Sequence, residues 1–344
     1  MTGLFQLIFF LVLGAFSAYV VDIQHANESE IYILVIHLLL ALGLYSSTYS
    51  IRLEDTKKNM RIIIPVITVG VLIKIGIISG VLFYFHNDPK YLILGIVVAQ
   101  IDPLSVAAIL NNSRMSKRVR TILASWASFD DPITVLLSFY ASMVVAYYMN
   151  IENTEINILN ISDYAVNLGA NISFAIVTFA IWYLIRKYSI LVYILLGVVM
   201  IIAVSHFLML GIALVGLFLR PSFDVFISCI TKIALWTSTF MLGMLMLDGI
   251  DIINGFWLAI VTFIAQIVVG FLLTKNLPIS DRIHLAFAQQ NGVTAIILAL
   301  TFEQIFAGIV AITAPAIFFI NLFYVMSNKT MNRYWYIIKE MDKK

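Results

Sequence analysis

The sequence predicts an all-α protein that crosses a membrane many times. Of its 344 residues, 62% are hydrophobic and 12% are charged, whereas soluble domains carry about 25% charged residues. The hydrophobic residues are gathered into long runs, and a helix needs about 20 such residues to cross the hydrocarbon core of a bilayer. About twelve candidate helices follow, at residues 3–21, 31–49, 62–85, 91–110, 119–148, 163–185, 189–205, 207–219, 224–247, 252–274, 282–302 and 306–326.

The two ends of the chain define the expected domain limits. The run at 3–21 has no basic leader and no small-residue cleavage site, so we interpret it as a retained helix and not as a signal peptide. The residues at 332–344 combine aromatic and basic side chains, which is typical of a short helix at the membrane interface and equally of a plain tail. We therefore expect a membrane domain at 1–329 and a short cytoplasmic tail at 330–344.

The distribution of Lys and Arg predicts how the chain is threaded through the membrane. Cytoplasmic loops are enriched in these residues. When the loops are assigned alternately to two sides, one side and the two termini carry 18 of the 21 Lys and Arg, while the other side carries Lys90 and mostly acids. We therefore expect both termini and the loop at 111–120 in the cytoplasm and the loop at 150–162 outside. The plasma membrane of a prokaryote is the expected location.

Two distant segments have a similar pattern of residues. Gln100-Ile-Asp-Pro-Leu-Ser-Val-Ala-Ala-Ile-Leu110 lies in the fourth run and Gln290-Asn-Gly-Val-Thr-Ala-Ile-Ile-Leu-Ala-Leu300 in the eleventh, and the next run in each case contains a central proline, Pro132 or Pro315. Seven helices separate the segments, an odd number, so they would enter the membrane from opposite sides. This pattern predicts inverted repeats at about 3–148 and 207–326, as in many secondary transporters.

Each of these segments contains a residue that interrupts a helix. Pro103 lacks an amide hydrogen and disfavours α geometry at Asp102, and Gly292 weakens the helix around it. Asp102 can also cap the half-helix that follows it. Freed backbone groups survive at membrane depth only where they line a cavity or are buried in protein. We therefore expect helices 4 and 11 to be discontinuous, with the ends of their half-helices beside a bound ion.

Three acids in the apolar runs are the strongest functional signal. An aspartate at the centre of a spanning helix costs about 2.5–3.5 kcal/mol and by default indicates an ion or proton path. Asp131 lies near the expected midplane, and we interpret it as a group that binds a monovalent cation or a proton. Asp130 points about 100° away on the same helix, so it is a second titrating acid or a hydrogen-bonded support. We expect Asp102 both to cap the half-helix that follows it and to lie beside the ion.

Further residues are candidates for supporting roles. Pro132 removes the amide that would bond the carbonyl of Ser128, which makes that oxygen a candidate cation ligand. Lys74 lies near the midplane as a counter-ion for an empty carboxylate or as part of a structural ion pair. The remaining candidate support residues are Trp126, Gln290 and Asn291.

No cofactor is expected. His37, His206 and His284 lack the spacing of metal ligands, so no metal is predicted beyond a transported monovalent cation. The single cysteine, Cys229, cannot form an internal disulfide. The net charge of +2 and the lack of a sizeable polar domain argue against nucleic acid as a ligand. Ions and membrane lipid are the partners that this composition favours.

The segment from Ile101 to Leu110, followed by Ser128-Phe129-Asp130-Asp131, resembles the monovalent cation/proton antiporters, in particular the sodium/proton exchangers. Their broken helix typically carries Thr-Asp-Pro, and their next helix carries Asn-Asp or Asp-Asp. The resemblance implies a core domain with crossed helices 4 and 11 that moves against a scaffold domain in an elevator-like motion, usually in a homodimer. It also implies that Asp131 is the essential ion-binding acid and that Asp130 matches its neighbour.

Two positions depart from the family pattern. Trp126 stands where many exchangers have a glutamate, and Asn291 stands where the matching arginine would be. If these two normally form a buried ion pair, both ends are missing together, which avoids leaving one buried charge without its partner.

The sequence thus predicts a secondary transporter, and not an enzyme, that exchanges Na+, Li+ or K+ for protons while both compete for Asp131. Three alternatives remain open. An ion-coupled carrier of a small organic anion would use the same fold, and a non-transporting relative would sense ions or pH. An intramembrane aspartyl protease would need facing acids such as Asp102 and Asp131, but the Tyr-Asp and Gly-x-Gly-Asp contexts of that family are absent.

Overall fold

The computed structural model describes residues 2–21, 29–49, 51, 56–103, 106, 115–149, 161–221, 224–246 and 249–343. Most of the half-helix expected after Pro103, part of the loop expected at 111–120 and most of the loop expected at 150–162 lie outside the described residues. Within them the secondary structure is helical, without a strand. The fold class predicted from composition and hydrophobic runs is therefore confirmed as all-α.

The helices follow the predicted apolar runs closely. Two predicted runs are divided: 62–85 becomes α4, η2 and α5, and 282–302 becomes α14 and α15. The run 306–326 corresponds to the first part of a longer α16. The elements are α1 (Thr2–Val21), α2 (Glu30–Tyr49), α4 (Met60–Pro65), η2 (Val66–Gly70), α5 (Val71–His86), α6 (Lys90–Val97), α8 (Lys117–Tyr148), α9 (Ile161–Ile185), α10 (Ser189–Ser205), α11 (Met209–Gly216), α12 (Asp224–Leu245), α13 (Ile252–Leu273), α14 (Ile279–Ala286), α15 (Val293–Glu303), α16 (Ile309–Arg333), α17 (Trp335–Glu340) and η4 (Met341–Lys343).

Among the described residues, five helices are both long and apolar enough to cross a membrane. One of them combines α4, η2 and α5 into a single stretch from Met60 to His86. Its π-helical turn, Val66–Gly70, directly follows Pro65, which has no amide hydrogen to donate to the preceding turn. The chain is thus a multi-pass membrane protein with one helix that changes its winding in mid-course.

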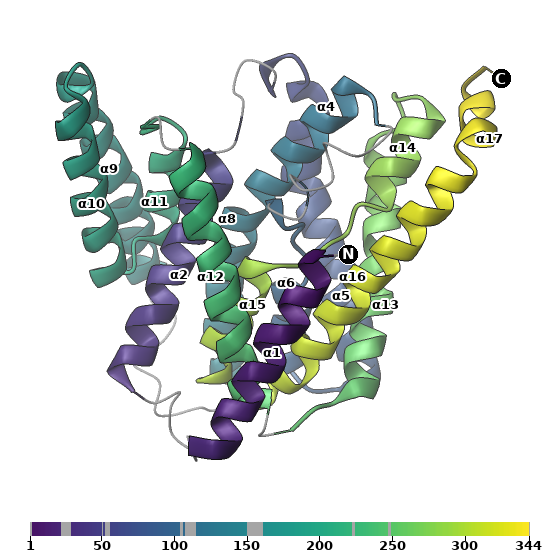
Figure 1. The fold of residues 1–344 in the computed structure, drawn as a ribbon, viewed down its shortest axis with the longest axis horizontal. Coiled ribbons are helices and arrows are strands. Elements are labelled where there is room, and N and C mark those ends of the chain that lie inside the picture. Colours follow the sequence, from purple (N-terminus) through teal and green to yellow (C-terminus); the bar gives the residue numbers. More distant parts are fainter. Residues whose placement is uncertain are drawn as a thin grey trace.

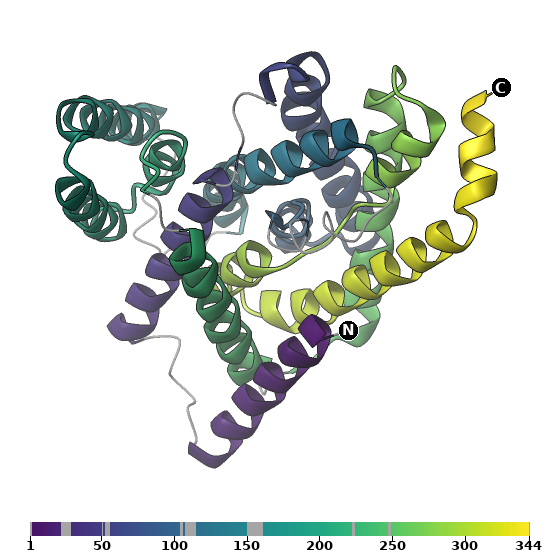
Figure 2. The same ribbon diagram turned by 45° about the horizontal axis from the view of Figure 1, so that its top comes forward.

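Two groups of helices can be followed in Figures 1 and 2. The helices α9, α10 and α11 stand beside α2, away from the rest, whereas α13 and α16 lie side by side on the opposite flank. The helix α1 packs along α12. A side chain at Gly14 would collide with the carbonyl of Phe240, and one at Gly243 would collide with the carbonyl of Leu11. These small residues let the two backbones touch, as is common between membrane helices.

The buried interior contains charged groups. Lys74, Asp130 and Asp131 have no exposed surface, and Asp102 is 4% exposed. They come from α5, α8 and the segment that follows α6. Because burying an unpaired charge is costly, their contacts decide what this part of the molecule can do.

Candidate functional site

Two helix interruptions meet in the centre of the protein. The helix α6 ends at Val97. The helix α14 ends at Ala286, and six residues separate it from the start of α15 at Val293. The backbone N–H of Asp102 donates to the carbonyl of Gln290 at 2.9 Å. The two stretches are therefore joined directly through their backbones, where the sequence predicted breaks.

Amide side chains complete this junction. The Nε2 of Gln289 donates to the carbonyls of Val98 and Gln100 at 3.1 and 2.7 Å, and the Nδ2 of Asn291 donates to Val98 at 3.0 Å. Asn321 of α16 holds Asn291 in turn. The side-chain oxygen of Asn321 accepts from the backbone N–H of Asn291, and the side-chain nitrogen of Asn321 donates to the carbonyl of Asn291. Carbonyls freed by the interruption of α6 are thus satisfied by uncharged amides.

Gly292 is required by the close approach of Asp102. A Cβ atom at this position would collide with the carboxyl group of Asp102. The carboxyl group therefore lies against the start of α15. A glycine is needed here for space, since its φ of −148° lies in the extended region open to any residue.

Asp131 is surrounded by uncharged donors from three parts of the chain. Its Oδ2 accepts from the hydroxyl of Ser47 on α2 at 2.7 Å and from that of Thr294 on α15 at 2.9 Å. The Gln100 amide, oriented to satisfy both of its polar atoms, donates to Oδ1 of Asp131 at 3.1 Å and accepts from the N–H of Ala295 at 2.6 Å. Among the described residues, no basic side chain forms an ion pair with this carboxylate.

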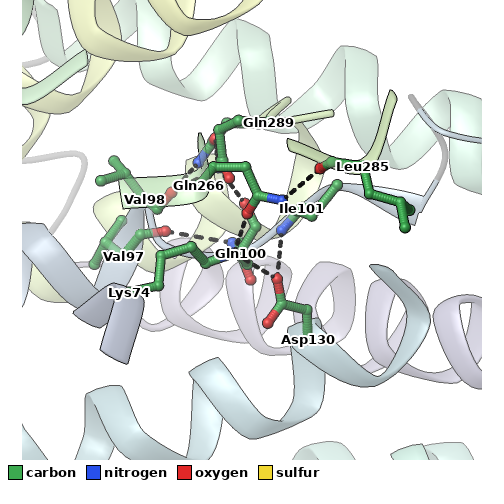
Figure 3. A network of polar contacts seen from close by, with 10 residues as sticks. Lys74, Val97, Val98, Gln100, Ile101, Asp130, Gln266, Leu285 and Gln289 are labelled. Carbon is green, nitrogen blue, oxygen red and sulfur yellow. Dashed lines mark hydrogen bonds and ion pairs between the residues drawn. The ribbon is translucent and has the colours of Figure 1, made fainter. Parts of the chain in front are cut away.

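The neighbouring acid has a different environment. Asp130 accepts from the Nζ of Lys74 at 2.9 Å and from the backbone N–H of Ile101 at 3.0 Å, both at Oδ2. Lys74 also donates to Gln266 of α13 at 3.2 Å, and Gln266 donates to the carbonyl of Leu285 at 3.0 Å. Figure 3 shows this chain of contacts from Asp130 to α14. Lys74 is therefore paired with Asp130 and not with Asp131.

The charges of Lys74 and Asp130 compensate each other, but that of Asp131 has no such counterpart among the described residues. Among those residues, Asp102, Asp130, Asp131 and Lys74 are the buried ionisable groups gathered here. Buried charges demand compensation, so this arrangement can take up protons, a small cation, or one of each.

The remaining residues singled out from the sequence take varied positions. Trp126 is fully buried with its ring 5.6 Å from the Nζ of Lys74. Ser128 is buried on α8, and Pro132 lies within α8 without ending it. Asn291 belongs to the amide junction.

Sequence reasoning missed several contacting residues. Ser47, Gln266, Gln289 and Asn321 are polar residues in or near apolar helices, a weak signal that many structural side chains share. Gln100 and Thr294 lie inside the two similar segments, so the pattern placed them near the interruptions without indicating their contacts with Asp131.

The far end of α14 is tied to the C-terminal segment. The carboxyl group of Asp342 accepts from the backbone N–H of Ser280 at 2.9 Å and from its hydroxyl. Asp281 accepts from the hydroxyl of Ser116 at 3.1 Å. Burial raises the pKa of Asp281, the hydrogen bond from Ser116 lowers it, and the nearby charge of Asp342 raises it. The carboxyl groups of Asp281 and Asp342 are therefore close enough to interact electrostatically where the tail meets α14.

Comparisons with known proteins find similarity to sodium/proton antiporters. No family model matches the chain. The Na(+)/H(+) antiporter ApNhaP of Aphanothece halophytica is 26% identical over 163 residues, which is 45% of this chain and 30% of that protein. The match thus spans about a third of the length of this relative.

Solved structures extend the likeness to nearly the whole chain. The sodium proton antiporter MjNhaP1 from Methanocaldococcus jannaschii at pH 8 superposes with a TM-score of 0.72, at 16% identity, over 94% of this chain and 92% of that one. A structure of MjNhaP1 from electron microscopy gives a TM-score of 0.64, at 17% identity, over 96% and 90%. The chain therefore has the fold of MjNhaP1, and its resemblance to the sodium/proton exchangers is confirmed.

Proposed function

We propose that this protein is a secondary active transporter that exchanges a monovalent cation for protons, with both competing for Asp131. One observation carries the proposal: Asp131 is a fully buried carboxyl group whose partners in the described residues are hydroxyl and amide groups. Such a carboxylate needs a positive charge that the protein does not supply beside it. A proton and a small cation both meet that need, and each excludes the other.

The partners of Asp131 suit this alternation. A hydroxyl group has one hydrogen to donate and two lone pairs to offer. Ser47 and Thr294 donate to the carboxylate, and after a rotation of the O–H bond their oxygens can face a cation instead. Oxygen atoms are the ligands that hard cations prefer. Neither hydroxyl has to leave its helix to change role.

Asp102 and Ser128 are the nearest candidates to complete a cation site. Asp102 lies at the interruption after α6, against Gly292, and supplies a second carboxylate. The carbonyl of Ser128, one turn before Pro132 on α8, is a second candidate oxygen ligand. Together with Asp131 they would surround a cation with oxygen atoms from α8 and from the junction of the two interruptions.

Asp130 is proposed as support for this site. It is engaged by an ammonium and by a backbone N–H, so it holds α8 against the segment after α6 while its neighbour exchanges ions. Trp126, Gln290 and Asn291 serve the same purpose, since they pack on Lys74 or join the two interruptions.

The architecture implied by the resemblance belongs to the same proposal. It comprises twelve spans in two inverted repeats, helices 4 and 11 crossing at their interruptions, and a core that moves against a scaffold in a homodimer with cytoplasmic termini. The contact between the two interruptions supports the crossing. Alternating access would then come from movement of the helices that carry Asp131 past α1, α2 and α12.

An organic anion is a poorer substrate for this site. Asp131 is a buried carboxyl group with no basic partner among the described residues, and a buried anion beside it would add a second negative charge. A non-transporting sensor would have the same contacts, so transport must be measured to separate the two.

The test is proton flux in liposomes that contain the purified protein. A pH gradient should collapse on addition of Na+, Li+ or K+, and the apparent affinity for the effective cation should weaken as the pH falls while the maximal rate stays constant. Constant affinity over the whole pH range would contradict competition. A gradient that no cation collapses would assign the protein to the non-transporting class.

A further inference from the structure

An apolar cavity of about 370 Å³ lies between the α1–α12 pair and the helices α13, α15 and α16. Ile250 and Ile252 line one end of it and are 52% and 58% exposed. Ile296 and Asn321, beside the second interruption, line another part. The cavity therefore connects the outer surface of the helix bundle with the neighbourhood of the junction.

The cavity offers almost no polar group to a ligand. Thr239 and Asn321 are the two polar residues in its lining, and both have partners within the protein. The hydroxyl of Thr239 donates to the carbonyl of Leu235 at 2.6 Å, and Asn321 is engaged by both backbone groups of Asn291. Apolar cavities of this kind stay dry and accept apolar ligands. A hydrated ion or a polar solute would lose its hydration without compensation.

The residues around the cavity indicate which apolar ligand can reach it. Ile8 of α1 and Phe318 of α16 line it and are 42% and 40% exposed, and α13 and α16 are long and apolar enough to cross the membrane. The rim therefore faces lipid hydrocarbon. A second copy of this chain would have to insert a helix about 10–12 Å across, whereas a single acyl chain is as thin as one extended side chain.

We propose that this cavity binds one acyl chain of a membrane phospholipid, inserted between the α1–α12 pair and α16. This inference goes beyond the proposed function, because it rests on the shape and lining of the cavity and not on the chemistry of Asp131. The inserted chain contacts Ile296 and Asn321, and Asn321 holds the backbone of Asn291. The lipid thus occupies the boundary between the two groups of helices that the proposed transport cycle moves.

Photolabelling tests the proposal directly. The protein is reconstituted in vesicles with a phosphatidylcholine that carries a diazirine near the end of one acyl chain, irradiated, and analysed by peptide mass spectrometry. We expect adducts on Ala314 and Ile317, which line the cavity and are only 4% and 6% exposed, in addition to adducts on outward-facing Ile194 and Ile253. Adducts confined to Ile194 and Ile253 would overturn the proposal.

Matched variants establish that the label enters the cavity. Ala314→Phe fills the space and should abolish labelling of Ile317, whereas Ile194→Phe, on the exposed face of α10, should leave it unchanged. Leu242→Phe fills the same cavity from α12 and replaces the first variant if that one does not fold. Persistent labelling of Ile317 in a folded, filled variant would contradict the assignment.

A second cross-linking experiment distinguishes a lipid from a second copy of the chain as the occupant of the cavity. Photoreactive methionine incorporated at Met246, in the cavity wall, should form a lipid adduct. A cross-link between two copies of the chain at this position, without a lipid adduct, would assign the cavity to a partner subunit and overturn the proposal.

Discussion

Two adjacent carboxyl groups, those of Asp130 and Asp131, have opposite surroundings. Asp130 faces an ammonium and a backbone N–H within a cluster built from α5, the segment after α6 and α13. Asp131 faces hydroxyl groups from α2 and α15 and an amide. A rotation of one residue along α8 therefore separates Asp130, whose charge is compensated by Lys74, from Asp131, whose charge is not. This difference is why we propose that Asp130 supports the site and that Asp131 exchanges ions.

The largest effect is expected for Asp131→Asn. The amide cannot exchange a proton for a cation, so cation-driven proton flux in liposomes should fall to the level of empty vesicles while the protein still elutes as a folded species. Asp281→Asn, which removes an acid outside the site, is the control and should retain flux. Substantial exchange by the Asp131 variant would remove the distinction between the two acids.

Lys74→Met tests the surroundings of Asp130, the acid that is paired with a lysine. It leaves Asp130 buried without its cation, and breaking a buried pair costs about 3–5 kcal/mol. We expect a clearly lower midpoint of thermal unfolding in detergent. The double variant Lys74→Met/Asp130→Asn removes both charges and should recover most of that loss. A double variant as unstable as the single one would show that the ion pair does not set the stability.

Thr294→Val tests the surroundings of Asp131, the acid without a basic partner among the described residues. It removes one hydroxyl donor from Asp131, and hydrogen bonds to charged groups contribute about 1.5–3 kcal/mol. The apparent cation affinity in the liposome assay should change by roughly tenfold or more. Thr301→Val on the same helix is the matched control, because its hydroxyl donates only to the carbonyl of Ile297. Equal effects of the two substitutions would argue against a role for the Thr294 oxygen.

The smallest effect is expected at the far end of α14. Burial raises the pKa of Asp281, so the folded protein disfavours its charged form. The stability from this group is present below its unfolded pKa and is lost as the pH rises through the folded pKa. Asp281→Asn should therefore flatten the decline of the unfolding midpoint as the pH rises above the ordinary pKa of an aspartate. An unchanged pH profile would exclude Asp281 as its source.

The sequence located the acids and the interruptions but not the pairing between them. Asp102, Asp130, Asp131 and Lys74 are visible because charge is rare in apolar runs, and Pro103 and Gly292 are visible because they weaken helices. Which acid Lys74 would meet depends on how α5 is rotated against α8, and one-dimensional spacing does not contain that angle. The roles assigned to these side chains stay predictions until transport is measured.

The partners of Asp131 could not be read from the chain for a related reason. Ser47 and Thr294 are 84 and 163 residues away from it, and serine and threonine occur in apolar helices without any function, bonded to their own backbone. Only the folded arrangement distinguishes Thr294, which reaches Asp131, from Thr301, which bonds within its own helix.

The long separations within the site have a consequence for biosynthesis. Ribosomes add about 5–20 residues per second, so Thr294 is made roughly 8–33 seconds after Asp131. Lys74 precedes Asp130 by 56 residues and Ser47 precedes Asp131 by 84, and both are already synthesised when these acids leave the ribosome. The first half of the chain therefore carries its own early partners for both carboxyl groups, and the ion site is completed only when α15 arrives.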